Sequence, residues 1–167
     1  MKKVVGVVVW IALLGLGCGY NFVGGGGKSE LPPDVQTVAI PIFANQTLVE
    51  GIESDITRAL VEKFTSARRL TMAGEDTADA VLTGTVKAFV AFPITVTLQT
   101  QTTTEYRATV TLEFIFQRQK DKKILRKEVL SEWRNYPVLA NLAATENNKK
   151  EAIRQIADLL AERVHEA

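Results

Sequence analysis

The sequence predicts an α+β domain in which two helices pack on one face of a four-stranded mixed β-sheet, in the order β-α-β-β-β-α. Three observations lead to this prediction. Apolar residues recur at helical spacing over residues 52–64, and they do so again over residues 153–164. Between these segments, apolar and polar residues alternate over residues 80–92 and 106–117, as they do in half-buried strands of an antiparallel sheet.

The N-terminal segment predicts export. Residues 1–17 combine two lysines with an apolar run from Val4 to Leu16, and Gly17 precedes the single cysteine, Cys18. This is the pattern of a signal peptide, and the run is shorter than the roughly 20 residues of a membrane-spanning helix. A cysteine at the cleavage point indicates a bacterial lipoprotein whose Cys18 carries a covalent diacylglycerol and an N-acyl chain. Leu16 stands one position later than in the usual lipoprotein signal, so an ordinary secretory signal is the alternative.

The residues after the cysteine predict where the chain is held. Gly19 stands where lipoproteins retained in the inner membrane of Gram-negative bacteria have aspartate, so an outer-membrane location at the periplasmic face is expected. Residues 18–33 are expected to form the lipidated N-terminus and a flexible tether, because they contain the run GGGGKSELPP. A single domain is expected over residues 34–167, long enough to bury a core without disulfides.

The first strand and helix are predicted near the start of this domain. The strand is expected over residues 35–43, and Pro41 suggests an edge or a strand end. Its apolar side consists of Val38, Ile40 and Ile42. Thr47 and Glu50 then have the spacing of a capping box, which is typical of a helix start. The buried side of this helix consists of Ile52, Ile56, Leu60 and Phe64. A polar loop follows over residues 66–79, with a short extended piece near residues 69–72.

Three further strands and a second helix complete the prediction. One face of the strand over residues 80–92 consists of Leu82, Gly84, Val86, Ala88 and Val90. The strand over residues 106–117 alternates more cleanly, with Ala108, Val110, Leu112, Phe114 and Phe116 on its apolar face. A turn at residues 120–123 precedes the last strand, for which the signals are Leu125, Val129 and Trp133. The C-terminal helix is expected to bury Ile153, Ile156, Ala157, Leu160 and Val164.

The composition argues against an enzyme. The single histidine, His165, lies near the C-terminus, and the single cysteine is expected to carry lipid, so neither a Cys–His nucleophile nor a His/Cys metal site is expected. Removal of residues 1–17 takes two lysines away and leaves one more acidic than basic side chain. Near-neutral charge does not suit a protein that coats nucleic acid, so no nucleic-acid partner is expected.

The connection between the second and third strands, residues 93–105, predicts an interaction surface. It is rich in threonine, and its only charged residue is Glu105 at its end. Because β-branched residues favour extended structure, the two strands are expected to continue into a long hairpin. One side of this hairpin would present Ile94, Val96 and Leu98 to a partner or to lipid. A disordered loop tip is the alternative.

A basic cluster at the opposite turn predicts a second candidate site. It comprises Arg118, Lys120, Lys122, Lys123, Arg126 and Lys127. Clustered ammonium and guanidinium groups can hold phosphate through charge-assisted hydrogen bonds, which makes Arg118, Lys120, Lys122 and Lys123 candidates for an anion site. Ordinary solvation of a charged turn is the alternative.

The ordered set of segments resembles the LptE family of lipopolysaccharide-assembly lipoproteins, also called rare lipoprotein B. The resemblance is carried by CGYNF from Cys18, the Gly-rich linker, TVAIPIFANQT, GIESDITRAL, ADAVLTGTV, EYRATVTLEF and a loop with Tyr136 before the last helix. It implies a protein that plugs the LptD β-barrel of the outer membrane, assists its assembly and binds lipopolysaccharide. A periplasmic adaptor or secretion lipoprotein related to the TolB N-terminal or curli-secretion modules is the alternative, because the front half of the chain suits both.

Overall fold

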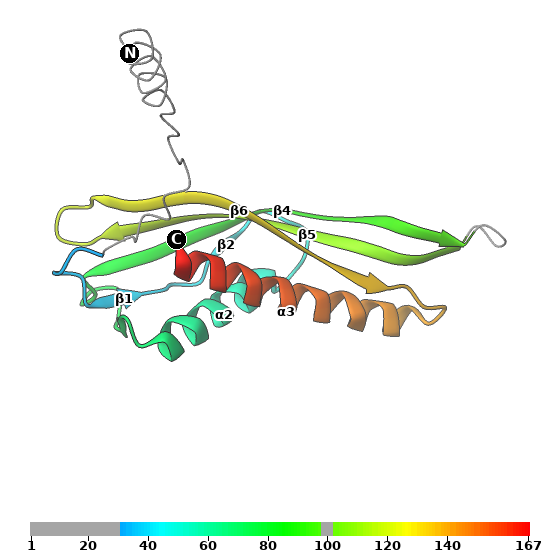
Figure 1. The fold of residues 1–167 in the computed structure, drawn as a ribbon, viewed down its shortest axis with the longest axis horizontal. Coiled ribbons are helices and arrows are strands. Elements are labelled where there is room, and N and C mark those ends of the chain that lie inside the picture. The colour runs from blue at the N-terminus through cyan, green and yellow to red at the C-terminus, as the bar shows by residue number, and fades with distance from the viewer. Residues whose placement is uncertain (1–30, 98–101) are drawn as a thin grey trace, which may run out of the picture. The chain divides into compact units, whose positions relative to one another are not determined.

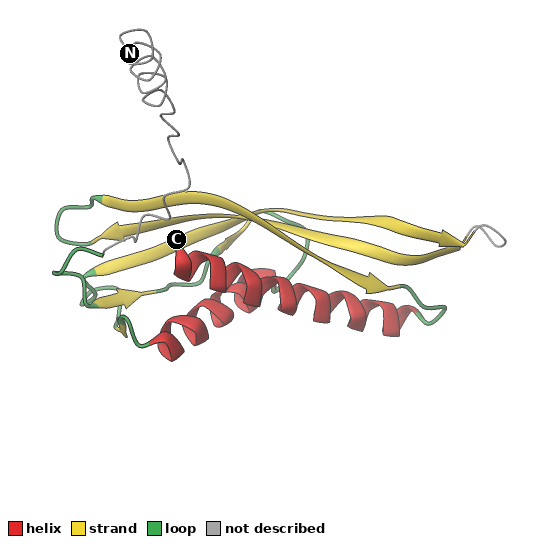
Figure 2. Ribbon diagram, viewed as in Figure 1, coloured by secondary structure: helices red, strands yellow, loops and turns green. Residues whose placement is uncertain are grey.

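The computed structural model describes residues 31–97 and 102–167. Over these residues the α+β prediction is confirmed, because the helices α2 (Ile52–Ala67) and α3 (Leu142–Glu166) lie together on one face of a mixed β-sheet (Figures 1 and 2). This part of the chain forms six strands rather than the four that were predicted. They are β1 (Thr37–Ala39), β2 (Ala44–Asn45), β3 (Thr71–Met72), β4 (Ala80–Thr97), β5 (Thr102–Arg118) and β6 (Ile124–Pro137).

The two additional strands are the short ones, β2 and β3. The sheet order is β3-β1-β4-β5-β6, and β2 pairs with β4. β1 runs parallel to β4 at Ala80 and Val81, and β2 continues along the same strand at Thr85 and Val86. β3 forms where a short extended piece was expected, and it runs parallel to β1. Strands of two residues are too short for an alternating pattern, so periodicity could not reveal them.

The predicted apolar side of the first strand is wrong beyond Pro41. β1 ends at Ala39, and Ile42, which was expected on the same side as Val38, is 74% exposed. Phe43 is buried in its place, and its backbone N–H donates to Thr57 Oγ1 of α2 at 3.1 Å. Proline has no N–H to donate to a neighbouring strand, so the strand ends near Pro41, as expected. After Pro41 the buried and exposed positions are exchanged, so that Phe43 is buried in place of Ile42.

The predicted capping box is also wrong. α2 begins at Ile52, and its N-cap is Gly51, which has a φ of 82° and no side chain to cap the helix. Thr47 instead closes a turn before the helix, because its N–H and its hydroxyl both donate to Asn45 Oδ1 at 2.8 Å. Asn45 Nδ2 then donates to Glu53 Oε2 at 2.8 Å, which ties this turn to α2. The spacing of Thr47 and Glu50 therefore reflects a turn.

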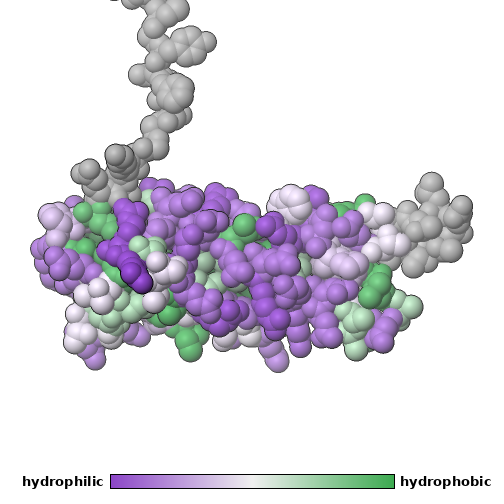
Figure 3. All heavy atoms as spheres, turned by 60° about the horizontal axis from the view of Figure 1, so that its bottom comes forward, coloured by the Kyte–Doolittle hydropathy of each residue, from purple (hydrophilic) through white to green (hydrophobic). Residues whose placement is uncertain are grey.

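The core lies between the sheet and the two helices, as predicted. The predicted apolar faces of α2, α3 and β5 are all buried: Ile52, Ile56, Leu60 and Phe64; Ile153, Ile156, Ala157, Leu160 and Val164; and Ala108, Val110, Leu112, Phe114 and Phe116. Burying such side chains is worth about 1.5–3 kcal/mol each relative to full exposure. The outer surface of the helices is mostly hydrophilic (Figure 3). The two helices therefore bury the apolar face of the sheet.

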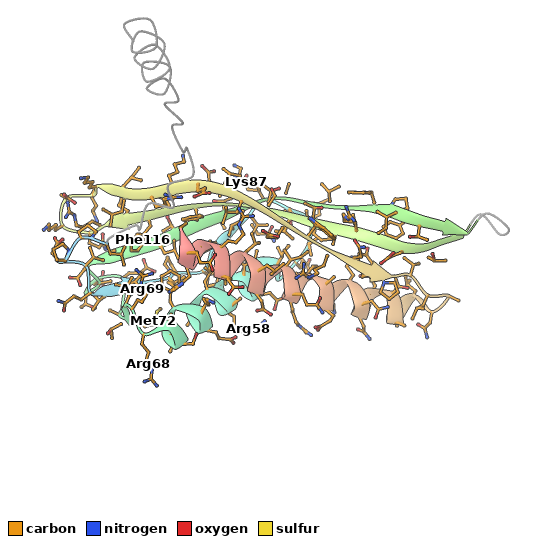
Figure 4. All side chains as sticks on the ribbon, viewed as in Figure 1. Arg58, Arg68, Arg69, Met72, Lys87 and Phe116 are labelled. Atoms are coloured by element: carbon orange, nitrogen blue, oxygen red, sulfur yellow. The ribbon has the colours of Figure 1, made fainter. Side chains whose placement is uncertain are left out.

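A bulge at Lys87 reverses the alternation of β4. Val86 pairs with Leu112, but Ala88 pairs with Thr111, so Lys87 is an extra residue in this strand. Its side chain lies on the face without helices, where it forms an ion pair with Glu113 at 3.9 Å (Figure 4). After the bulge, Val90 is 52% exposed although the sequence placed it with the core residues of β4. One added residue moves the following side chains, as far as the next register shift after Pro93, to the other face.

Candidate interaction surfaces

The basic cluster lies at the turn between β5 and β6, where four of its six members form ion pairs: Arg118, Lys120, Arg126 and Lys127. Arg118 Nη2 donates to Asp121 Oδ2 at 2.7 Å, and Arg118 Nη1 lies 3.3 Å from Asp34 Oδ2. Lys120 forms a second ion pair with Asp34. The Lys120 ammonium lowers the pKa of Asp34, and the Arg118 guanidinium lowers the pKa of Asp121. These carboxylates offset much of the positive charge that the sequence indicates.

Lys122 and Lys123 are the less neutralised members of the cluster. Lys122 Nζ donates to Gln119 Oε1, and neither lysine has a carboxylate within 4.0 Å among the described residues. Arg126 and Lys127, in contrast, pair with Glu128 at 2.7 Å and with Glu113 at 3.0 Å. The structure thus brings the predicted anion-site residues together at one turn but leaves only two of them with ammonium groups available to a ligand.

The long hairpin is present. β4 continues to Thr97 and β5 begins at Thr102, and Thr95 Oγ1 donates to Glu105 Oε2 across the two strands at 3.2 Å. Ile94 is half-buried. The side chain of Val96 and all of Leu98 lie outside the described residues, as does Cys18. Their proposed contacts stay predictions.

The face of the sheet opposite the helices carries an apolar patch. It consists of Val90 and Phe92 of β4 and Val129 and Trp133 of β6, which are 52%, 43%, 57% and 46% exposed. We call these four residues the open-face patch. Val90 and Trp133 both pair with Thr109 of β5, so they stand in one row across three strands. These four side chains therefore share one face of the sheet, where Thr109 and Arg107 of β5 stand between β4 and β6.

Arg107 of β5 stands beside this patch, between Phe92 of β4 and Asn135 of β6. Its Cζ is 3.9 Å from the centroid of the Trp133 ring, and its Nε donates to Asn135 Oδ1 at 3.1 Å. Stacking of a guanidinium on an indole is a favourable cation–π contact. It holds both side chains in place, so the patch presents an ordered indole with a positive charge stacked on it. Tryptophan and arginine are the residues most enriched at the energetic centres of protein interfaces.

The sequence contained a signal for this patch that the prediction did not use. Val129 and Trp133 were treated only as indications of a strand. β6, however, has apolar residues at both odd-numbered and even-numbered positions. Leu130 and Tyr136 are buried on the helix side, and Val129 and Trp133 lie on the opposite side. Apolar residues on both sides of a strand are typical of a strand that is covered on both faces.

Neither a membrane-spanning helix nor a metal centre is found in the described part of the chain. No helix there is both long enough and apolar enough to cross a bilayer. No group of three or more His, Cys, Asp or Glu side chains is placed to hold a metal ion in the same residues. His165 packs edge-on against Phe64, with ring centroids 5.3 Å apart, and burial lowers its pKa.

Solved structures of bacterial lipoproteins share this fold. Rare lipoprotein B from Shewanella oneidensis is 15% identical with a TM-score of 0.53, covering 75% of this chain and 89% of its own. A minor lipoprotein from Acinetobacter baumannii is 14% identical with a TM-score of 0.51, covering 79% and 90%. Lipoprotein B from Nitrosomonas europaea is 13% identical with a TM-score of 0.52, covering 82% and 83%. At such low identity these similarities show the fold alone.

The family is shown by the sequence itself. No curated protein sequence matches the chain. The model of the LptE family, described as lipopolysaccharide-assembly, matches residues 35–167, which include all of the strands and helices described above. This match distinguishes between the two families that the front half of the sequence left open. The chain therefore belongs to the LptE family of lipopolysaccharide-assembly proteins.

Proposed function

We propose that this protein is a lipid-anchored outer-membrane lipoprotein that plugs an LptD-like β-barrel, assists its assembly and takes part in lipopolysaccharide transport to the outer leaflet. Membership of the LptE family over residues 35–167 supports a role in lipopolysaccharide assembly. The lipid on Cys18 would hold the protein at the periplasmic face of the membrane. The role is one of binding and assembly, without a catalysed reaction.

The observation that carries the proposal is the open-face patch with Arg107 stacked on Trp133. The helices cover the other face of the sheet, so this face is the one available for a large partner. Between the apolar residues it presents hydroxyl groups, and Thr111 and Ser131 share a hydrogen bond at 3.0 Å. The interior of an outer-membrane barrel is polar, so a surface of hydroxyl groups with aromatic anchors suits contact with its wall.

The turn between β5 and β6 is the proposed lipopolysaccharide or anion site. Lys122 and Lys123 would be the main contacts of the anion. Arg118 already forms ion pairs with Asp34 and Asp121, and Lys120 forms one with Asp34. A phosphate group can still engage Lys120 if it displaces Asp34, because the Lys120–Asp34 ion pair is exposed and therefore weak. The hairpin residues Ile94, Val96 and Leu98 are proposed as additional contacts with the barrel.

Site-specific photo-crosslinking in intact cells tests the barrel contact. A photoreactive amino acid replaces Val129 in the open-face patch, and in the matched control it replaces Asp158, which is exposed on α3. We expect the residue at position 129 to form a crosslink with a large β-barrel protein and the residue at position 158 to form none. A barrel crosslink from position 158 alone would move the contact to the helices. Crosslinks only to soluble periplasmic proteins would favour the adaptor function.

A further inference from the structure

Strand β6 has no partner strand on one of its two sides. It is the last strand of the sheet, and among the described residues it pairs only with β5 (Figure 1). The N–H of Val138 donates to the Thr104 carbonyl at 2.9 Å, and these two residues continue the register in which Tyr136 pairs with Tyr106. Because hydrogen-bonded pairs alternate along an antiparallel ladder, the even-numbered residues of β6 are bonded to β5. The odd-numbered residues therefore point their N–H and C=O groups away from the sheet.

The outward-pointing backbone groups of β6 are almost all without a partner in the described part of the chain. They belong to Lys127, Val129, Ser131, Trp133 and Asn135, which we call the β6 edge. The one hydrogen bond that reaches them in these residues runs from Arg134 Nη1 to the Trp133 carbonyl at 3.1 Å. No proline and no register shift interrupts this stretch. A long free edge of this kind is a template for pairing with another strand.

The β6 edge complements a second, antiparallel copy of itself. If Ser131 of one copy faces Ser131 of the other, then Val129 faces Trp133 and Lys127 faces Asn135, each of them twice. All of these residues have outward-pointing backbone groups, so each opposed pair can exchange two hydrogen bonds. Opposed side chains lie on the same face of a sheet. Val129 and Trp133, which are 57% and 46% exposed, would therefore cover each other as a β-branched and an aromatic side chain.

The same alignment brings opposite charges together, because Glu128 of each copy faces Arg134 of the other. Arg134 has no carboxylate within 4.0 Å among the described residues, so it can leave the Trp133 carbonyl for this glutamate. Glu128 already pairs with Arg126 at 2.7 Å, but a carboxylate has two oxygens and accepts from both arginines. Pairing thus supplies the carboxylate that Arg134 lacks.

Other alignments of two β6 edges fit less well. With Leu130 at the centre, Arg126 faces Arg134 and Glu128 faces Glu132, so both pairs oppose like charges. With Glu132 at the centre, the two copies of Glu132 face each other. A centre one residue further toward either end leaves Arg134 opposite an uncharged residue or places an edge residue opposite the proline that ends β6, which has no N–H. The charges therefore select one register.

We propose that two copies of this chain pair through β6, with Ser131 on the two-fold axis, before either copy meets a barrel. The same surface on both copies forms such an interface, which closes at two subunits. Pairing covers Val129 and Trp133, which the proposed barrel contact also uses, so the pair and the barrel complex are alternative states. In the free protein, the pairing keeps the β6 edge from other chains. It requires neither a barrel nor lipopolysaccharide.

Disulfide formation in the full-length protein, purified in detergent without a barrel, tests the register. Ser131→Cys places two thiols at the axis, where the Cα atoms of a hydrogen-bonded pair lie about 5.5 Å apart, within the range of disulfides. Lys127→Cys is the matched control, because it is exposed on the same edge but faces Asn135. After mild oxidation with copper phenanthroline, we expect a disulfide dimer from Ser131→Cys and none from Lys127→Cys alone. Lys127→Cys mixed with Asn135→Cys is expected to form one.

Mass spectrometry of the linked peptides separates these disulfides from any that involve Cys18, the only natural cysteine. Equal dimer formation at positions 131 and 127 overturns the pairing, because chance encounters within a detergent micelle would link both. The absence of a disulfide at position 131 overturns it as well.

A charge exchange tests the pairing without cysteines. Arg134→Glu is expected to raise the dissociation constant of the pair about tenfold, because it opposes Glu128 twice. Glu128→Arg combined with Arg134→Glu is expected to restore pairing, since each new arginine again faces a glutamate. The mass of the particle is measured by sedimentation, and circular dichroism reports folding. A wild type that is monomeric at micromolar concentration overturns the inference, and so does an exchange that restores nothing.

Discussion

The ring of Phe43 lies directly against the backbone of Gly84, so that a Cβ on residue 84 would overlap the ring. Phe43 comes from the segment between β1 and β2, whereas Gly84 belongs to β4. Only glycine leaves this space in the middle of a strand. The missing side chain in β4 thus admits a buried aromatic ring from the neighbouring segment.

We expect Gly84→Ala to destabilise the fold by about 1–3 kcal/mol, which is typical of overpacking a filled core. The free energy of unfolding is measured by denaturant titration. Gly74→Ala is the matched control, because the nearest atom to a Cβ there is Thr77 Oγ1 at 3.7 Å, an ordinary contact. Equal effects of the two substitutions would show that the Phe43 contact is not tight in solution.

Asp79 is expected to make stability depend on pH at the acidic end. Its Oδ2 accepts the hydroxyl of Thr37 at 2.7 Å and the N–H groups of Thr37 and Gln36 at 2.9 and 3.0 Å. These bonds, the Thr37 hydroxyl first, lower the pKa of Asp79 below its ordinary value of 3.8. Because the pKa is lower in the folded state, the stabilisation is complete above 3.8 and is lost as the pH falls through the folded pKa.

The measurement compares wild type with Asp79→Asn in urea unfolding from neutral to acidic pH. We expect the wild type to be more stable at neutral pH and the difference to shrink as the solution is acidified below the ordinary pKa of Asp79. Asp158→Asn controls for the removal of one exposed carboxylate. A difference that does not change with pH would mean that the bonds to Thr37 and Gln36 do not depend on the charge of Asp79.

The anion site is tested by two pairs of substitutions at the same turn. Lys122→Gln with Lys123→Gln is expected to weaken lipopolysaccharide binding, most strongly at low salt, where charges are least screened. Arg118→Gln with Lys120→Gln is expected to weaken it less, because Asp34 and Asp121 already offset these charges. Binding to the full-length protein is measured at two ionic strengths. A larger loss from the second pair would show that lipid phosphate displaces Asp34, and no loss from either would move the site elsewhere.

Lipidation is tested by Cys18→Ala. Without the sulfur that accepts the diacylglycerol, the chain is expected to accumulate as an unprocessed or unlipidated form. A mass spectrum of the N-terminus and fractionation of the membranes report the result. Normal processing and normal fractionation of this variant with the membranes would rule out the lipid anchor and support the ordinary secretory signal.

Periodicity in the sequence predicted the elements that bury one continuous face. Every fourth residue of α2, the apolar side of α3 and every second residue of β5 are in the core as expected. The failures occur where a single local event changes the phase. Pro41 ends β1, and Lys87 adds a residue to β4, so that Ile42 and Val90 are exposed. Such events follow from pairing between strands, which periodicity within one strand does not contain.

The sequence by itself determined the elements of the domain, the basic turn and the family resemblance. Helical and strand periodicity and local charge depend on residues that are close along the chain, so they can be recognised without the fold. Only the tertiary structure decided how much of that charge is available, since Asp34 reaches Arg118 from 84 residues away. It also decided that Trp133 lies on the open face beside Arg107, and that β6 lies at the edge of the sheet. Alternation divides a strand into two sides, but packing of the helices determines which side is covered.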